Sequence, residues 1–408
     1  MKPRDASMKR ARNRGKEAGQ ALVLAAIGLT LFILAAGLGI DMGFLRYQKR
    51  LQQSAADSAA IAGASEINYG DVTTAAKTDS ASNGFTDGVD NVTITVSHPP
   101  ADGPHAAASG YVEVLVTKIQ PTFFLRIAGV NTETITARAV ALLSNAQNCM
   151  YALGTGSGGI TDNGSGGVSA PNCGIIDNHN LHKNGSGSIT AREIGVAGVV
   201  TKNGSGSISP TPKTGIVPAA DPLAYLQPPA AGNCLPNNAG NVNGSNAVTL
   251  NPGNYCGGIS INGTPNVTLN PGMYTITGGG LLFNGSGTVS GTGVTLYIGP
   301  SGGAVTMNGS QTVDLTAPTT AADAGILLYQ NAGNSSTATI NGSQNSQFQG
   351  ALYFPSAQLT INGTGNKAAY TIAVANTYQL NGLFVLSFPA DYSSLPNGSP
   401  IKNAILVE

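Results

Sequence analysis

The feature that most limits how this chain can fold is a dipeptide, Asn-Gly, which recurs from residue 163 onward. A short run rich in Val, Leu, Ile or Thr enters each copy and another leaves it, as in LLFNGSGTVSGTGVTLYIG at 281–299. Ten of these asparagines stand at positions 163, 184, 203, 243, 262, 284, 308, 341, 362 and 381. Most of the intervals between these positions are close to about 20 residues, and such a fixed period predicts a repeat architecture.

Stacked coils explain this period better than hairpins do. Asn-Gly favours the two-residue turns of β-hairpins, but a meander of hairpins needs no such regular spacing. A right-handed parallel β-helix needs one, because each coil uses short strands separated by tight corners, where Gly adopts and Asn tolerates left-handed conformations. We therefore predict a mainly β chain with a solenoid at 149–408, a β-sandwich or barrel being the alternative. The long interval from Asn203 to Asn243 is interpreted as two coils with one corner unmarked.

Stacking would place one corner asparagine above the next, so that their side-chain amides could form a ladder like those of cross-β stacks. We predict this structural role for Asn184, Asn203, Asn243, Asn262, Asn284, Asn308, Asn341, Asn362 and Asn381. The same Asn-Gly-Ser and Asn-Gly-Thr triplets match acceptors of N-glycosylation, an interpretation that would apply to a eukaryotic secreted protein.

Four cysteines lie in the predicted solenoid, and an even number outside the cytoplasm favours disulfides. Cys149 and Cys173 are separated by roughly one coil of sequence, and so are Cys234 and Cys256. Neighbouring coils lie about 4.8 Å apart, within the range that a disulfide accepts. We therefore predict these two pairs. The second would close an excursion at 210–236, whose seven prolines exclude it from core strands.

The N-terminus has the pattern of a membrane anchor. Residues 1–17 carry a net charge of +5, and the run that follows, 18–40, contains no charged side chain. This run is long enough to cross a bilayer, and it is longer than the apolar part of a cleaved signal peptide, the competing interpretation. The positive-inside rule predicts a cytoplasmic tail at 1–17, a transmembrane helix at 18–40 and an extracytoplasmic remainder.

Residues 41–148 are predicted to form a helical stem and a small α+β module. Apolar and alanine positions recur at helical spacing in 41–66. Alternating, β-branched segments at 92–97, 111–118 and 132–143 predict strands. Between the last two strands, PTFFLRIAGV at 121–130 opens with Pro and closes near Gly, as a short helix would.

The sequence offers little for catalysis. Charged residues make up 10% of the chain, and residues 222–313 contain no Asp, Glu, Lys, Arg or His. Carbohydrate-active enzymes need grouped carboxylates or a basic residue that accepts a proton. The densest polar cluster comprises Asp177, His179, His182, Lys183, Arg192 and Glu193, which we interpret as a polar loop rather than a metal site. We therefore expect no catalytic residues, cofactor or metal. We also expect no nucleic-acid partner, because the net charge of the chain is zero.

Residues 18–65 closely resemble the N-terminal segment of TadG-like proteins of the Flp (Tad) pilus system. The resemblance rests on Gly19-Gln20-Ala21, the apolar run, Asp41 with Gly43, and Leu51-Gln52 followed by Ala56-Asp57-Ser58-Ala59-Ala60. PTFFLRIAGV at 121–130 and ITARAVA at 135–141 are similar to the next segment of that family. One departure concerns Leu24, which occupies the place where related pseudopilins carry a glutamate after the processing glycine. This departure argues against cleavage by a prepilin peptidase and favours a retained anchor.

Together these observations predict a single-pass protein of the bacterial inner membrane that acts in Flp pilus assembly, anchoring or adhesion. The resemblance implies other Tad components as partners, and the uncharged solenoid would suit surface glycans or self-association. Two alternatives stay open: a β-helix carbohydrate-active enzyme, and a secreted adhesin released by signal cleavage.

Overall fold

The chain divides into two compact units, which are described separately. In this computed structural model, the described residues are 11–408 except 69, 146, 157, 231, 309, 342–345, 363–368 and 384. The first unit comprises Met1–Ser144 together with Asn403–Glu408, and the second comprises Asn145–Lys402. The sequence-based boundary at 149–408 differs at its end, because the last residues belong to the first unit.

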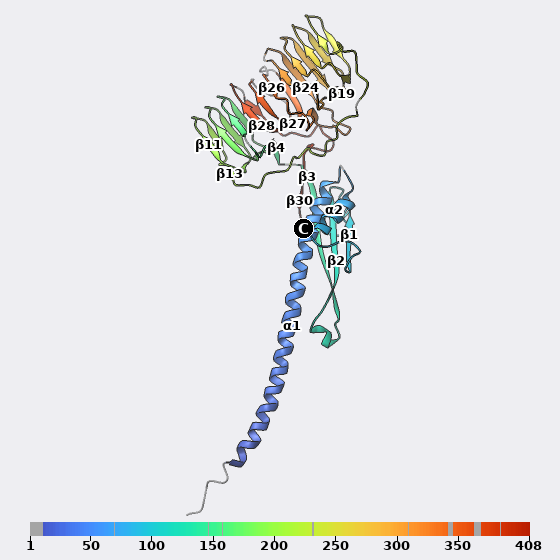
Figure 1. The fold of residues 1–408 in the computed structure, drawn as a ribbon, viewed down its shortest axis with the longest axis vertical. Helices are drawn as coiled ribbons and strands as arrows, with labels where there is room; N and C mark the ends of the chain where they lie inside the picture. Colours follow the sequence, from blue (N-terminus) through green and yellow to red (C-terminus); the bar gives the residue numbers. More distant parts are fainter. Residues whose placement is uncertain are drawn as a thin grey trace, which may run out of the picture. The chain divides into compact units, whose positions relative to one another are not determined.

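A single 55-residue helix, α1 (Ala11–Ser65), dominates the first unit (Figure 1). It unites the predicted transmembrane run and the predicted stem without a break, as expected from its straight-chain and alanine residues. Within the described part of the chain, only this helix is long and apolar enough to span a membrane, with a mean hydropathy of 2.5 in its most apolar window. The second helix, α2 (Val72–Ser82), begins at the N-cap Asp71, whose carboxylate accepts the Thr73 and Thr74 backbone N–H groups.

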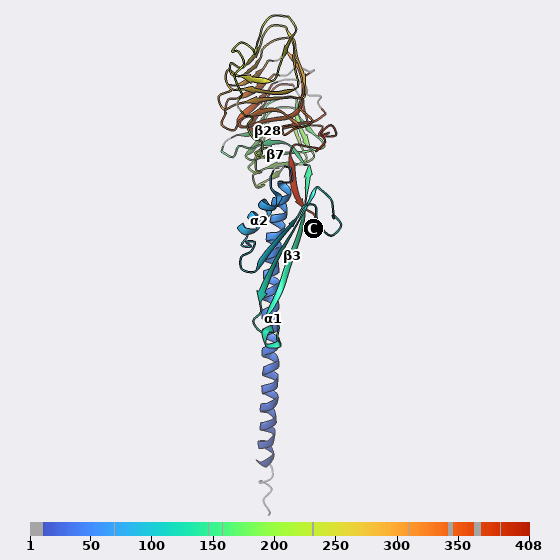
Figure 2. The same cartoon turned by 90° about the vertical axis from the view of Figure 1, so that its right-hand side faces the viewer.

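A four-stranded sheet packs against α1 in the order β1–β2–β3–β30 (Figure 2). The strands are β1 (Val92–Ser97), β2 (Tyr111–Pro121), β3 (Thr132–Asn145) and β30 (Lys402–Leu406), and the 3₁₀-helix η1 (Leu125–Ala128) lies in the turn from β2 to β3. The β1–β2 and β2–β3 pairs are antiparallel. The backbone N–H groups of Val140 in β3 and of Glu408 each donate to the backbone oxygen of the other residue. The end of the chain therefore runs antiparallel to β3. The second unit is thus inserted between two neighbouring strands.

The second unit is the predicted parallel β-solenoid, and it has about 10 turns. The turns contribute strands to three faces. On the first face the stacking order is β13 (Lys213–Thr214), β10 (Ile194–Val196), β7 (Gly174–Asp177), β4 (Asn148–Ala152), β28 (Thr371–Leu380), β27 (Gln347–Ile361), β25 (Ile326–Gln330), β22 (Val294–Ile298), β19 (Gly272–Ile276) and β16 (Gly253–Tyr255).

The second face follows the same order. It stacks β11 (Val200–Lys202), β8 (Asn180–Lys183), β5 (Gly159–Asp162), the ends of β28 and β27, β26 (Ala338–Ile340), β23 (Val305–Met307), β20 (Leu281–Phe283), β17 (Ile259–Ile261) and β14 (Asn241–Val242). The third face has two shorter sheets. One stacks β12 (Ser207–Ser209), β9 (Ser188–Ala191), β6 (Gly167–Ala170) and β29 (Val385–Ser387); the other stacks the start of β27, β24 (Thr312–Thr316), β21 (Thr288–Thr292), β18 (Asn266–Leu269) and β15 (Val248–Leu250).

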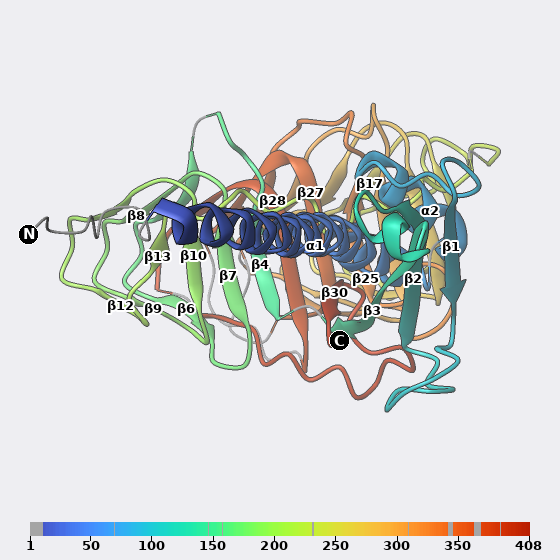
Figure 3. The ribbon, with the colours of Figure 1, turned by 90° about the horizontal axis from the view of Figure 1, so that it is seen from below.

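The order of the coils in space is not their order in the chain. The chain enters at β4, in the interior of the stack, and builds outward to β13; it resumes at β14, at the opposite end, and returns until β28 stacks on β4 and β5. Figure 3 shows β10, β7, β4, β28 and β27 side by side in this sequence. The interpretation of the long interval from Asn203 to Asn243 as two coils is therefore wrong. The described residues of 215–230 and 232–240 belong to a strap that links the two ends of the stack.

One apolar core fills the solenoid. Alternate strand residues point inward, as period-two geometry requires, and examples such as Ile175, Leu281 and Phe283 are at most 1% exposed. The joint between β28 and β4 belongs to the same core, because Tyr378 and Met150 are buried there. A coil from either part of the chain can thus pack on the other through the same residue pattern.

Candidate functional site

Asp41 joins the turn between β2 and β3 to helix α1. Its side chain is 1% exposed, and its carboxylate accepts the backbone N–H groups of Phe123, Phe124 and Leu125 at 2.8, 2.8 and 2.6 Å. These N–H groups lie at the start of η1. Because N–H groups at the start of a helix lack partners within the helix, a carboxylate is a suitable acceptor for them. The Phe124 ring lies against Gly37, where an added Cβ would come within 2.7 Å of it.

Glutamines and small residues continue this contact along α1. The Gln52 amide donates to the backbone oxygens of Val116 and Ile135 at 3.2 and 3.0 Å and is completely buried. Ala55, Ala56, Ala59, Ala60 and Ala64 are completely buried in a core that also includes strand residues of the sheet and Ala76 of α2. The marks that carried the family resemblance, including Asp41, Gln52, Ala56 and Ala59, thus hold the sheet on the helix.

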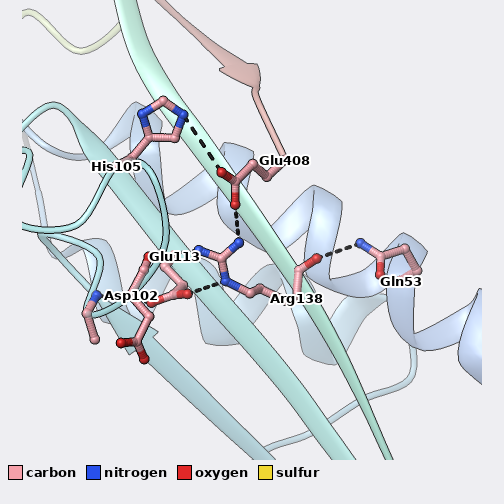
Figure 4. Close-up of polar contacts among 7 residues, drawn as sticks. Gln53, Asp102, His105, Glu113, Arg138 and Glu408 are labelled. Atoms are coloured by element: carbon pink, nitrogen blue, oxygen red, sulfur yellow. Dashed lines mark hydrogen bonds and ion pairs between the residues drawn. The ribbon is translucent and has the colours of Figure 1, made fainter.

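A charged cluster holds the end of the chain in the first unit (Figure 4). The Arg138 guanidinium bonds the carboxylates of Glu113 and Glu408 and donates to the Asp102 backbone oxygen at 3.0 Å. His105 lies 3.9 Å from the Glu408 carboxylate. The Glu113 side chain is only 2% exposed, so its charge depends on Arg138 for compensation. This cluster holds the chain end that follows β30 beside β3.

Ten corner asparagines form one continuous ladder along the solenoid. Each side-chain Nδ2 donates to the Oδ1 of the next asparagine, and the distances are 2.7–3.4 Å in eight of the nine bonds. The order is Asn203, Asn184, Asn163, Asn381, Asn362, Asn341, Asn308, Asn284, Asn262 and Asn243. Asn163 lies outside the set predicted from the sequence; its side-chain Nδ2 donates to Asn381 Oδ1 at 3.1 Å and carries the ladder across the joint.

Two disulfides fasten particular coils. Cys149 is bonded to Cys173, with Cα atoms 5.7 Å apart, and joins β4 to the residue just before β7. Cys234 is bonded to Cys256, with Cα atoms 5.5 Å apart, and ties the end of the strap to the coil of β16. The strap is also held through tyrosines: the Tyr353 hydroxyl donates to the Asp221 carboxylate at 2.6 Å, and Tyr329 donates to the Leu226 backbone oxygen at 3.1 Å. Burial and the nearby Asp221 raise the pKa of Tyr353.

The polar cluster at the start of the solenoid does not converge on one point. The Asp177 carboxylate is buried and accepts the backbone N–H groups of Ile160 and His179, both at 2.9 Å. Burial raises the pKa of Asp177, against the effect of those hydrogen bonds. Lys183 is completely buried and lies 3.2 Å from the Asp162 carboxylate.

Arg192 and Glu193 lie 3.5 Å apart on the surface, and Lys213 lies 3.8 Å from Glu193. Among the residues that the structure describes, no group of three His, Cys, Asp or Glu side chains could hold a metal ion. Of the six polar residues singled out in the sequence, Asp177 accepts the His179 backbone N–H, and His182 lies in β8. Lys183 pairs with Asp162, and Arg192 lies beside Glu193.

Two family models match separate parts of the chain. Residues 19–66 match the family described as putative Flp pilus-assembly TadE/G-like, and this segment is most of α1. Residues 231–393 match a domain of unknown function, DUF7305, which here covers the coils from β14 to β29 and leaves those from β4 to β13 outside. No curated protein matches the chain. No solved structure matches it either.

Proposed function

We propose, on the premise that residues 19–66 are a TadE/G-like pilus-assembly segment, that this chain is a membrane-anchored structural protein of the bacterial envelope. In this proposal α1 spans the inner membrane with residues 1–17 in the cytoplasm, and the solenoid presents a rigid surface outside it. The observation that carries the proposal is that the matched segment contains both the apolar run and the residues that hold the sheet.

The solenoid is, in this proposal, a scaffold or adhesive surface and not an enzyme. A stack of ten ladder rungs extends about 43 Å at 4.8 Å per step. Its corners expose uncharged amides, which suit glycans or protein surfaces bound through hydrogen bonds. The lack of any Asp, Glu, Lys, Arg or His in 222–313 supports a non-catalytic role for those coils.

Removal of the solenoid tests which part serves assembly and which serves adhesion. The connections to residues 145–402 leave neighbouring antiparallel strands, so a short Gly-Ser turn can join Ser144 to Asn403. A host lacking the gene would be complemented with the full chain or with this shortened chain. We expect both chains to be recovered in the membrane fraction and both to support pilus formation. Only the full chain should restore adherence to surfaces.

Three other outcomes would alter the proposal. Loss of pili with the shortened chain would assign the solenoid to assembly rather than adhesion. Normal pili and adherence in the host that lacks the gene would refute a pilus role. Recovery of the full chain in the medium, beginning after residue 36, would favour the cleaved adhesin.

A further inference from the structure

The turn between β2 and β3 presents apolar side chains outward. Ile127 is 72% exposed, Phe123 is 48% exposed and Val130 is 39% exposed. In the same module Val112, Val114 and Val116 are completely buried, and Ile127 is the most exposed large apolar side chain among the module's described residues. We name residues 122–130 the tip. A cluster of this kind on a protein surface indicates a contact with an apolar partner.

The tip lies against the part of α1 where the apolar run ends. Phe124 contacts Gly37, inside the run, and the ring of Phe123 packs on that of Phe44 with centroids 5.1 Å apart. The run ends at Ile40, so Gly37 lies about 5 Å inside it at 1.5 Å per residue. Apolar faces of interfacial segments are typically buried about 5–10 Å into the boundary between headgroups and acyl chains.

The surface of α1 beyond the run suits lipid headgroups. Arg46, Lys49 and Arg50 are exposed there, together with Tyr47. Basic side chains attract anionic headgroups, and tyrosine is enriched at membrane interfaces. Along α1, the end of the apolar run is therefore followed by basic side chains. This order matches that of a bilayer leaflet, in which the acyl chains are followed by the phosphates.

The geometry points to a second membrane contact: we propose that the tip is inserted among the phospholipid acyl chains of the leaflet nearest to the module. This inference rests on the proposed membrane anchoring by α1. The helix and the tip then enter the same bilayer, and Asp41 holds the tip at a fixed depth through its three backbone hydrogen bonds. The contact would orient the module on the membrane surface, which one helix alone does not do.

Tryptophan fluorescence tests this directly, because the chain contains no tryptophan. Ile127→Trp would report on the tip, Leu29→Trp on the middle of the apolar run, and Ala106→Trp on the loop before β2, at the opposite end of that strand. All three positions are exposed. Each full-length variant is reconstituted in phospholipid vesicles with lipids brominated either near the headgroup or near the bilayer centre.

For Ile127→Trp we expect a blue-shifted emission that is quenched most strongly by bromines near the headgroup. Leu29→Trp should be quenched most strongly by central bromines, and Ala106→Trp by neither. Quenching of Leu29→Trp without quenching of Ile127→Trp would overturn the inserted tip and leave the anchor intact. A blue-shifted but unquenched Ile127→Trp would mean that a protein covers the tip, which also overturns the inference. Absence of quenching at Leu29 would refute the anchor and the tip together.

Discussion

At the scale of single residues, Asp41 and the corner asparagines have distinct tasks. Asp41 supplies one carboxylate to three backbone donors of a distant turn. The asparagines supply one amide per coil, and each inner member both donates and accepts. Loss of Asp41 should therefore act locally, whereas loss of a ladder residue should affect the neighbouring coils.

Replacing Asp41 by Ala should release the tip from α1. The three N–H groups would lose their acceptor, so amide exchange at Phe123, Phe124 and Leu125 should accelerate by at least about tenfold. Hydrogen-exchange mass spectrometry on the full chain measures this. Gly43→Ala is a suitable control, because an added Cβ there meets nothing within 4 Å. Unchanged exchange at the tip would show that Asp41 does not hold it.

A ladder asparagine inside the stack should contribute more than one at its end. Asn362 donates to Asn341 at 2.7 Å and accepts from Asn381 at 2.8 Å, whereas Asn203 only donates, to Asn184 at 2.9 Å. Asn362→Ala should lower the free energy of unfolding by about 1–3 kcal/mol, and Asn203→Ala by about half as much. Denaturant unfolding of both variants measures the difference. Equal losses would mean that the side-chain bonds do not determine the effect.

At the scale of elements, the repeat pattern alone does not predict the strap or the joint between β28 and β4. The strands and their parallel pairing could be predicted, because β-branched runs and Asn-Gly corners mark each coil locally. The order of the coils could not, because every coil buries the same kind of apolar residue and can stack on any other. The only local sign of the strap was the proline-rich stretch between Asn203 and Asn243.

The same limit applies to the candidate site. Asp41 and Gln52 could be singled out by family resemblance, but their partners Phe123 and Val116 lie 82 and 64 residues further along the chain. The cluster of Arg138 with Glu408 was missed for the same reason, since nothing in the sequence places the last residues beside β3. Long-range contacts of this kind have no periodic signal.

The strap should loosen when its acidic contact is removed. Asp221→Ala would leave the buried Tyr353 hydroxyl without its carboxylate partner. We expect faster cleavage within residues 215–230 under limited proteolysis, with the coils on either side intact. Val217→Ala is the matched control, because Val217 is 86% exposed in the same strap. Equal cleavage of the two variants would argue that Asp221 does not fasten the strap.

At the scale of the whole solenoid, the joint between β28 and β4 predicts which distant residues are neighbours. Asn163 and Asn381 are hydrogen-bonded although 218 residues separate them. The double variant Asn163→Cys, Asn381→Cys should therefore form an intramolecular disulfide under oxidising conditions, since neighbouring coils lie about 4.8 Å apart. Peptide mapping of the monomer by mass spectrometry detects it.

The pair Asn203→Cys, Asn243→Cys provides the contrast. These residues are much closer in sequence than the first pair but lie at opposite ends of the ladder. We expect no intramolecular disulfide between them. A bond between these two, with none between the first pair, would show that the coils stack in chain order.

The interior position of β4 also bears on how the protein is made. Translation delivers residues 149–214 long before 371–388, so the coils from β4 to β13 must exist for a time with an unpaired edge. Such an edge can recruit foreign strands, and closing so long a separation is slow. The newborn chain is thus exposed to mispairing until its final turn arrives.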